Sequence, residues 1–168
     1  RAARPRGPRA RRVSPSHDFD LAVVGSGVVG LAHAALAHER GQRVVVIERT
    51  DRPVGASIRN FGHVGITTQD GEGLAYARAG RAHWLRLAGQ AGFWIKEAGT
   101  LIVARADDEW ALLERFAELR GEAVRLLNPA ETRELASIAD PRLVGAAHCG
   151  NDLRVNLPEA IPALAAYL

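Results

Sequence analysis

The sequence predicts an α/β fold that opens on a strand–turn–helix–strand unit with two strands of a parallel sheet. Two short apolar runs, residues 21–24 and 44–47, are typical of strands that are buried on both faces. After residue 91 the pattern changes to short strands and short helices, which predicts part of a second, mixed α+β domain. The first run is followed by three glycines in the spacing G-x-G-x-x-G: Gly25, Gly27 and Gly30.

Each of the three glycines has its own expected role. Gly25 allows the turn out of the first strand, and Gly27 lets the backbone approach a pyrophosphate. Gly30 lets the following helix pack closely against the strand. The N–H groups at the start of that helix, near Val28 and Val29, are expected to point at the anion, which the helix dipole also favours. The unit is therefore a predicted dinucleotide-binding, Rossmann-like fold.

Glu48 ends the second apolar run, eighteen residues after Gly30. Its carboxylate is placed to accept hydrogen bonds from ribose hydroxyls, and it would repel the 2′-phosphate of NADP. The uncharged stretch from Leu21 to Ala37 has seventeen residues and three glycines, which is too short and too broken for a membrane span. We therefore expect a nucleotide site here and not a membrane-spanning segment, while membrane association of the protein stays open.

The charge of the chain is unevenly distributed. The 168 residues carry a formal charge of +3, but residues 1–12 hold six arginines and no acid, so residues 13–168 have a formal charge of −3. A mildly acidic body argues against a nucleic-acid-binding surface. Residues 1–17 form an Arg- and Pro-rich tail that we expect to be disordered. Its prolines oppose an amphipathic targeting helix.

Cys149 is the single cysteine, so no intrachain disulfide forms and a reducing, cytoplasmic location fits. We expect it to be a small buried residue. The histidines at 17, 83 and 148 show no metal-ligand spacing, and no metal site is predicted.

Further elements follow from hydrophobic periodicity and from capping and turn residues. Arg49–Thr68 is expected to be a long, irregular, functional loop. Helices are expected at 72–91, at 107–121 and at 158–168, and a short helix is expected to begin at Pro129 with Asn128 as its cap. Two extended segments are expected within 93–104, on either side of Gly99. Further extended segments are expected at 126–127, 145–149 and 153–157.

Three features resemble the D-amino-acid oxidase, glycine oxidase and sarcosine oxidase family of FAD-dependent oxidoreductases. The first is the glycine pattern with Glu48, and the second is the glycine-rich loop Gly55–Gly62. The third is the segment 153–164, which is similar to the point where the family's chain returns to its FAD domain. The run Ser-Ile-Arg-Asn-Phe-Gly-His looks most like a branch associated with aminophosphonate breakdown. Family members are about twice as long, so the resemblance is to the N-terminal portion.

The resemblance implies a division of the chain and a set of cofactor-binding residues. Residues 18–91 are the N-terminal part of the FAD-binding domain, 92–152 the first part of the substrate domain, and 153–168 the return into the FAD-binding domain, which is then incomplete. The residues implied to hold FAD are Gly25, Ser26, Gly27, Val28, Val29, Gly30, Glu48, Arg49, Ser57, Arg59, Asn60, Phe61 and Gly62.

Some relatives attach FAD through a histidine in this loop. Arg59 stands near that position here, which favours noncovalent FAD. Arg59 is also a candidate partner for a substrate carboxylate or phosphonate, but the simpler interpretation is a structural arginine that holds the loop or the pyrophosphate. His63 is either a contact for flavin or substrate or an ordinary polar loop residue.

The implied reaction oxidises the C–N bond of a small amine by hydride transfer to flavin, after which water hydrolyses the imine. The electron acceptor is oxygen or another acceptor, and no general base is identified. The sequence does not determine the oligomeric state. We expect the fragment alone to be inactive. The alternatives are a NAD-dependent dehydrogenase, a flavin monooxygenase and a noncatalytic nucleotide-binding piece. The dehydrogenase would not need the long glycine-rich loop.

Overall fold

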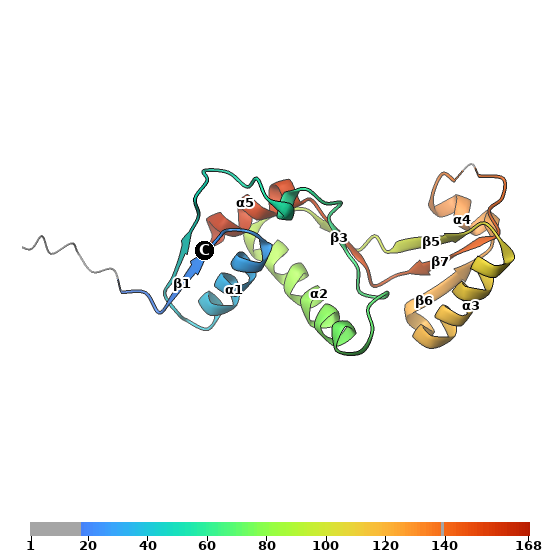
Figure 1. Cartoon of the computed structure of the whole chain (residues 1–168), viewed down its shortest axis with the longest axis horizontal. Helices are drawn as coiled ribbons and strands as arrows, with labels where there is room; N and C mark the ends of the chain where they lie inside the picture. The colour runs from blue at the N-terminus through green and yellow to red at the C-terminus, as the bar shows by residue number, and fades with distance from the viewer. Residues whose placement is uncertain (1–17, 139) are drawn as a thin grey trace, which may run out of the picture.

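The computed structural model describes residues 18–138 and 140–168, so the predicted disorder of residues 1–17 lies outside the described residues. The molecule is elongated (Figure 1). Helices α1, α2 and α5 lie with β1 in one half, and α3 and α4 lie with β5, β6 and β7 in the other half. The two halves are joined by a narrow region of strands that includes β3.

The predicted strand–turn–helix–strand unit is present. Strands β1 (Leu21–Val24) and β2 (Val44–Ile47) pair in parallel, and helix α1 (Val28–Glu39) crosses between them. Small and apolar side chains of α1 are fully buried, among them Leu31 and Ala34. The expectation that both strands are buried on both faces is wrong here, because Val24 and Ile47 are 84% and 53% exposed. The described sheet has only two strands, so little covers its ends.

The loop after β2 is less irregular than expected. A 3₁₀ turn covers Ala56–Ile58, and a short strand, β3, covers His63–Val64. Helix α2 (Gly71–Ala91) follows and ends at Gly92, whose φ is +75°. The helix agrees with the prediction for 72–91, and the stop at Gly92 is an additional finding.

The second sheet joins distant parts of the chain in the order β3-β8-β4, with all pairs antiparallel. Strand β4 spans Ile95–Lys96 and β8 spans Leu153–Val155. Helix α5 begins at Leu157, which was expected to be extended, and runs to Tyr167. It packs on α1 and α2 around a shared apolar core that includes Leu31, Leu87, Ile161 and Leu164. The end of the described chain thus returns to the first half, while the assignment of the halves as two functional domains stays a prediction.

The third sheet has the order β5-β7-β6, all antiparallel, with β5 at Thr100–Ala104, β7 at Gly145–Cys149 and β6 at Val124–Leu127. The two strands predicted around Gly99 are therefore present but belong to different sheets. Helix α3 (Asp107–Arg120) leads into a 3₁₀ turn (Gly121–Ala123), and α4 spans Pro129–Leu135. Asn128 caps α4 in a capping box with Glu131, as its side-chain type predicts. Cys149 is buried, as expected.

Candidate functional site

An open cleft of about 310 Å³ lies at the carboxyl ends of β1 and β2, where nucleotides bind in open α/β sheets. The turn after β1 forms one wall, and the residues after β2 form the other. Of the predicted cofactor-binding residues, six line this cleft: Gly25, Ser26, Gly27, Glu48, Arg49 and Ser57.

The glycine turn has the close packing that its spacing predicts. Gly25 has φ of +100°, a conformation that other residues rarely adopt. A Cβ atom on Gly30 would lie 2.0 Å from the carbonyl oxygen of Gly25, so no larger residue fits there without moving α1 away from β1. The N-cap of α1 is Gly27, which has no side chain to cap the first N–H groups.

The start of α1 is tied to the glycine-rich loop. The backbone N–H of Val28 donates to the side-chain oxygen of Ser57 at 2.9 Å, and Ser57 lies 29 residues further along the chain. A Cβ on Gly27 would lie 3.2 Å from the same oxygen, so the absence of a side chain at 27 lets Ser57 approach. The Val28 N–H, expected to point at an anion, thus already has a side-chain acceptor.

Glu48 is held by the two walls of the cleft. Its Oε2 accepts from the N–H of Ser26 at 2.8 Å and from the hydroxyl of Ser26 at 3.1 Å. Its Oε1 accepts from the N–H groups of Arg49 and Thr50 and from the hydroxyl of Thr50, at 2.8, 3.2 and 3.2 Å. Hydrogen bonds lower the pKa of Glu48 to about 2. The largest effect comes from the N–H of Ser26, followed by the N–H of Arg49, the hydroxyl of Ser26 and the N–H of Thr50. Glu48 is therefore ionised at neutral pH.

These bonds define how a ribose would reach Glu48. The three N–H donors belong to the backbone and hold the carboxylate in place. The two hydroxyl donors, from Ser26 and Thr50, rotate about single bonds and can be replaced by ribose hydroxyls. Sequence reasoning missed Thr50, because a threonine two residues after an acid has no distinguishing pattern.

The glycine-rich loop is held by its own asparagine. The side-chain amide of Asn60 donates to the carbonyl oxygens of Ala56 and Ser57 at 3.0 and 3.4 Å. Its side-chain oxygen accepts the N–H of Gly62 at 2.9 Å. Gly62 in turn accepts the N–H of Val155 in β8 at 2.8 Å. The loop is thereby connected to the second sheet.

A second cleft, of about 790 Å³, lies beside this loop. Asn60 and Phe61 line it, with Trp94 from the segment before β4 and Arg154 from β8. Phe61 is 88% exposed, so its ring is accessible from this cleft. Arg59 lines neither of these two clefts.

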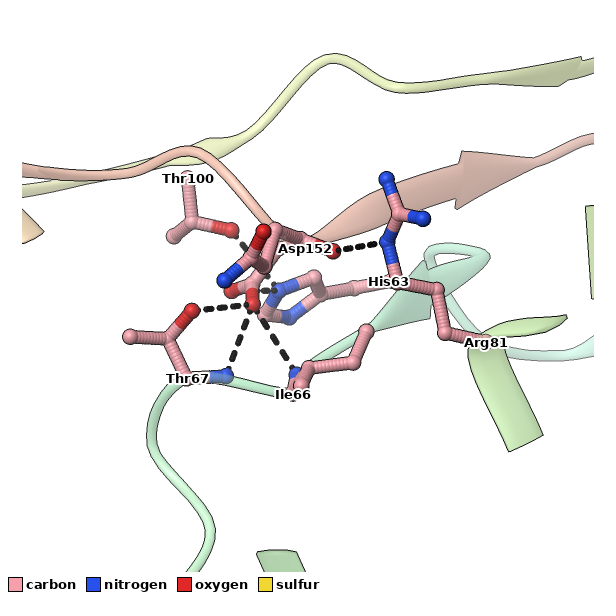
Figure 2. Close-up of polar contacts among 7 residues, drawn as sticks. His63, Ile66, Thr67, Arg81, Thr100 and Asp152 are labelled. Carbon is pink, nitrogen blue, oxygen red and sulfur yellow. Dashed lines mark hydrogen bonds and ion pairs between the residues drawn. The ribbon is translucent and has the colours of Figure 1, made fainter. Parts of the chain in front are cut away.

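Asp152, just before β8, is bonded to the segment that follows β3 (Figure 2). Its side chain is fully buried, and Oδ1 accepts from the N–H groups of Ile66 and Thr67 and from the hydroxyl of Thr67, each at 2.9 Å. Burial raises the pKa of Asp152, but the bonds from Thr67, Ile66 and Thr100 outweigh burial and hold the pKa below its ordinary value. The sequence around Asp152 reads as an ordinary polar turn, so this role was not predicted.

His63 lies against Asp152, but the arrangement is not a catalytic triad. Nε2 of His63 is 3.3 Å from Oδ2 of Asp152 and 2.8 Å from the hydroxyl oxygen of Thr100 (Figure 2). A triad needs the acid and the hydroxyl on opposite ring nitrogens, whereas both contact the same nitrogen here. We interpret the cluster as a structural junction.

The comparisons with known proteins agree with this geometry. Residues 20–168 match the family described as DAO, FAD-dependent oxidoreductase, and the chain belongs to that family. The structure is similar to glycine oxidase from Geobacillus kaustophilus (27% identity, TM-score 0.76, 90% of this chain and 44% of that one). It is also similar to glycine oxidase from Bacillus cereus (25% identity, TM-score 0.76, 89% and 43%).

A curated D-amino acid dehydrogenase from Helicobacter pylori is 23% identical over 89% of this chain and 49% of its own length. The chain thus spans about half of that relative and less than half of the two glycine oxidases. The resemblance to the N-terminal portion of this family is confirmed. In the described part of the chain, no helix has the length and apolar character needed to cross a membrane.

The residues present fit the FAD that the family implies. The start of α1 fits a phosphate, because its N-cap Gly27 has no side chain to cover the first N–H groups, although the N–H of Val28 is already bonded to Ser57. Ionised Glu48 supplies an acceptor for ribose hydroxyls. Across residues 18–138 and 140–168, no group of three metal-binding side chains occurs.

Proposed function

We propose that the full-length protein oxidises the C–N bond of a small amine with noncovalently bound FAD. The substrate would be an amino acid, an N-methyl amino acid or an aminophosphonate. The observation that carries the proposal is the course of the Gly55–Gly62 loop. Ser57 lines the nucleotide cleft, and Asn60 and Phe61 line the second, larger cleft. One loop thereby connects a dinucleotide site to a space large enough for a flavin ring and a small substrate.

The chain's own residues would bind and orient the reactants. The chemistry that bound FAD would supply is a hydride acceptor for the carbon that bears the amine. The α1 N-terminus and Glu48 would hold the pyrophosphate and the ribose, with Arg49 beside them. The loop from Ser57 to Gly62 would lie along the flavin ring and help exclude water. The imine product would then be hydrolysed by water to a carbonyl compound and ammonia or a smaller amine. We assign no general base.

Two features support noncovalent attachment of FAD. Arg59 stands near the position at which some relatives have a histidine. The histidine nearest to it, His63, lies with its Nε2 against Thr100 and Asp152. Acid precipitation of the purified protein tests this part of the proposal: yellow colour in the supernatant supports noncovalent FAD, whereas colour in the pellet contradicts it.

The main experiment is a visible spectrum of protein expressed from its complete reading frame, followed by anaerobic addition of amines. A yellow protein bleached by glycine, sarcosine or 2-aminoethylphosphonate supports the proposal and identifies the substrate class. A colourless protein that binds NADH and takes up no FAD would instead support the dehydrogenase alternative. A yellow protein that no amine bleaches would contradict amine oxidation.

We further propose the cytoplasm as the location, which cell fractionation tests. The electron acceptor is oxygen or another acceptor. Oxygen consumption during turnover indicates oxygen, whereas turnover that requires an artificial acceptor and consumes no oxygen indicates another acceptor.

A further inference from the structure

Three basic side chains stand in one row across the β3-β8-β4 sheet. In the antiparallel register, Arg154 of β8 is directly opposite His63 of β3 on one side and Lys96 of β4 on the other. Side chains of directly paired residues project from the same face of a sheet. Leu153 and Val155, which flank Arg154, are buried on the opposite face. The row of His63, Arg154 and Lys96 therefore lies on the exposed face.

His63 contacts the carboxylate of Asp152, so the unneutralised charges of the row are those of Arg154 and Lys96. Like charges directly opposite each other destabilise a strand pair, and an anion bound between Arg154 and Lys96 would relieve this repulsion. Within the described part of the chain, no carboxylate forms an ion pair with Arg154 or Lys96, and neighbouring Glu97 pairs with Arg81 of α2 instead.

The row also lies beside the residues predicted to contact the flavin. Arg154 and Phe61 both line the 790 Å³ cleft. The same two residues line a smaller cleft of about 220 Å³, together with His63 and Thr100. Arg154 thus stands between two clefts, next to the loop that the proposed function places along the flavin ring.

We propose that Arg154, with Lys96 and His63 on either side, binds the oxyanion group of the amine substrate, a carboxylate or a phosphonate. This inference rests on the proposed function and assigns its substrate anchor. The planar guanidinium of Arg154 presents two parallel N–H donors that match either group. Arg154 replaces Arg59 in this role, since Arg59 lines neither the nucleotide cleft nor the second cleft.

The test measures anion affinity separately from turnover. Calorimetric titration of the full-length protein, saturated with FAD, with acetate and with methylphosphonate gives the two dissociation constants. Arg154→Gln is expected to weaken the better-bound anion by about ten- to a hundredfold, the range for hydrogen bonds to a charged group. Arg154→Lys is expected to bind this anion with an affinity between those of the wild type and Arg154→Gln. Lys96→Gln is expected to raise the dissociation constant of this anion by about threefold.

Arg125→Gln is the matched control, because Arg125 is also an exposed strand arginine directly opposite a histidine, His148, in the third sheet. It is expected to leave both dissociation constants unchanged. Which anion binds more tightly distinguishes a carboxylate substrate from a phosphonate substrate.

The outcomes separate this inference from the proposed function. If the wild type binds neither anion, or if Arg154→Gln and Lys96→Gln bind it as tightly as the wild type, the proposed anion site at Arg154 is contradicted. If Arg154 determines anion affinity but no amine bleaches the flavin, the anion site is supported and the proposed amine oxidation is contradicted. If Arg154→Gln does not fold, Arg154→Lys and Lys96→Gln decide the question.

Discussion

The hydroxyl oxygen of Ser57 accepts the backbone N–H of Val28 at 2.9 Å, which ties the glycine-rich loop to the first turn of α1. The two residues belong to the two separate motifs that the sequence predicts to hold opposite parts of FAD. Their contact makes the motifs one continuous wall. The position of the loop therefore depends on the start of the helix.

Removing this contact is expected to weaken FAD binding. Ser57→Ala loses a hydrogen bond of about 0.5–1.5 kcal/mol, which corresponds to roughly a two- to tenfold higher dissociation constant for FAD. The constant is measured by titrating the apoprotein of the full-length chain and following flavin fluorescence. Ser137→Ala, at an exposed position after α4, is the control. Equal affinities for the two variants would contradict the role given to Ser57.

Glu48 is expected to make stability depend on pH in one direction. The pKa of Glu48 is lowered from 4.5 to about 2 in the folded protein. The contribution of Glu48 to the stability of the fold is therefore fully present above pH 4.5 and is lost as the pH falls toward 2. Melting temperatures of the wild type and of Glu48→Gln should differ most at neutral pH and converge between pH 4.5 and pH 2. A difference that is constant over this range, or that grows in acid, would show that Glu48 is not held as described.

Gly62 is expected to tolerate no side chain. Its φ is +66°, and a Cβ there would lie 1.9 Å from the carbonyl oxygen of Val155, a backbone atom that cannot rotate away. Gly62→Ala should destabilise the protein by more than about 1 kcal/mol in chemical denaturation. Gly89→Ala is the matched control: Gly89 lies in α2 with open space around it, and the change should stabilise by about 0.5–1 kcal/mol. Equal effects would argue against the close contact.

Asp152 is expected to be the most sensitive carboxylate of the junction between the two halves. Asp152→Asn removes a buried charge that accepts three hydrogen bonds on Oδ1, and it should lower the free energy of unfolding by about 2–3 kcal/mol. Asp20→Asn, which breaks an exposed ion pair with Arg43, should lower the free energy of unfolding much less. Denaturant titrations of both variants measure the difference. A small effect at Asp152 would mean that the junction relies on its strand pairing.

The sequence was sufficient for the features that depend on local spacing. The glycine turn, α1, Glu48 at the end of β2 and the cap of α4 depend on backbone conformation and on neighbours within a few residues. Hydrophobic periodicity predicted α2, and the acids at its start with Gly121 at its end predicted α3. Such signals are readable because each one is satisfied by residues close together in the chain.

Contacts between distant segments were decided only by the tertiary structure. The bond from Val28 to Ser57, the burial of Asp152 beneath Thr67, and the row of His63, Arg154 and Lys96 join residues that are 29 to 91 positions apart. No local pattern marks them, because a lone acid in a turn or an arginine in a strand reads the same whether it faces water or a neighbour. Their roles follow from the pairing of β8 with two strands that are far apart in the sequence, and that pairing is a property of the folded chain.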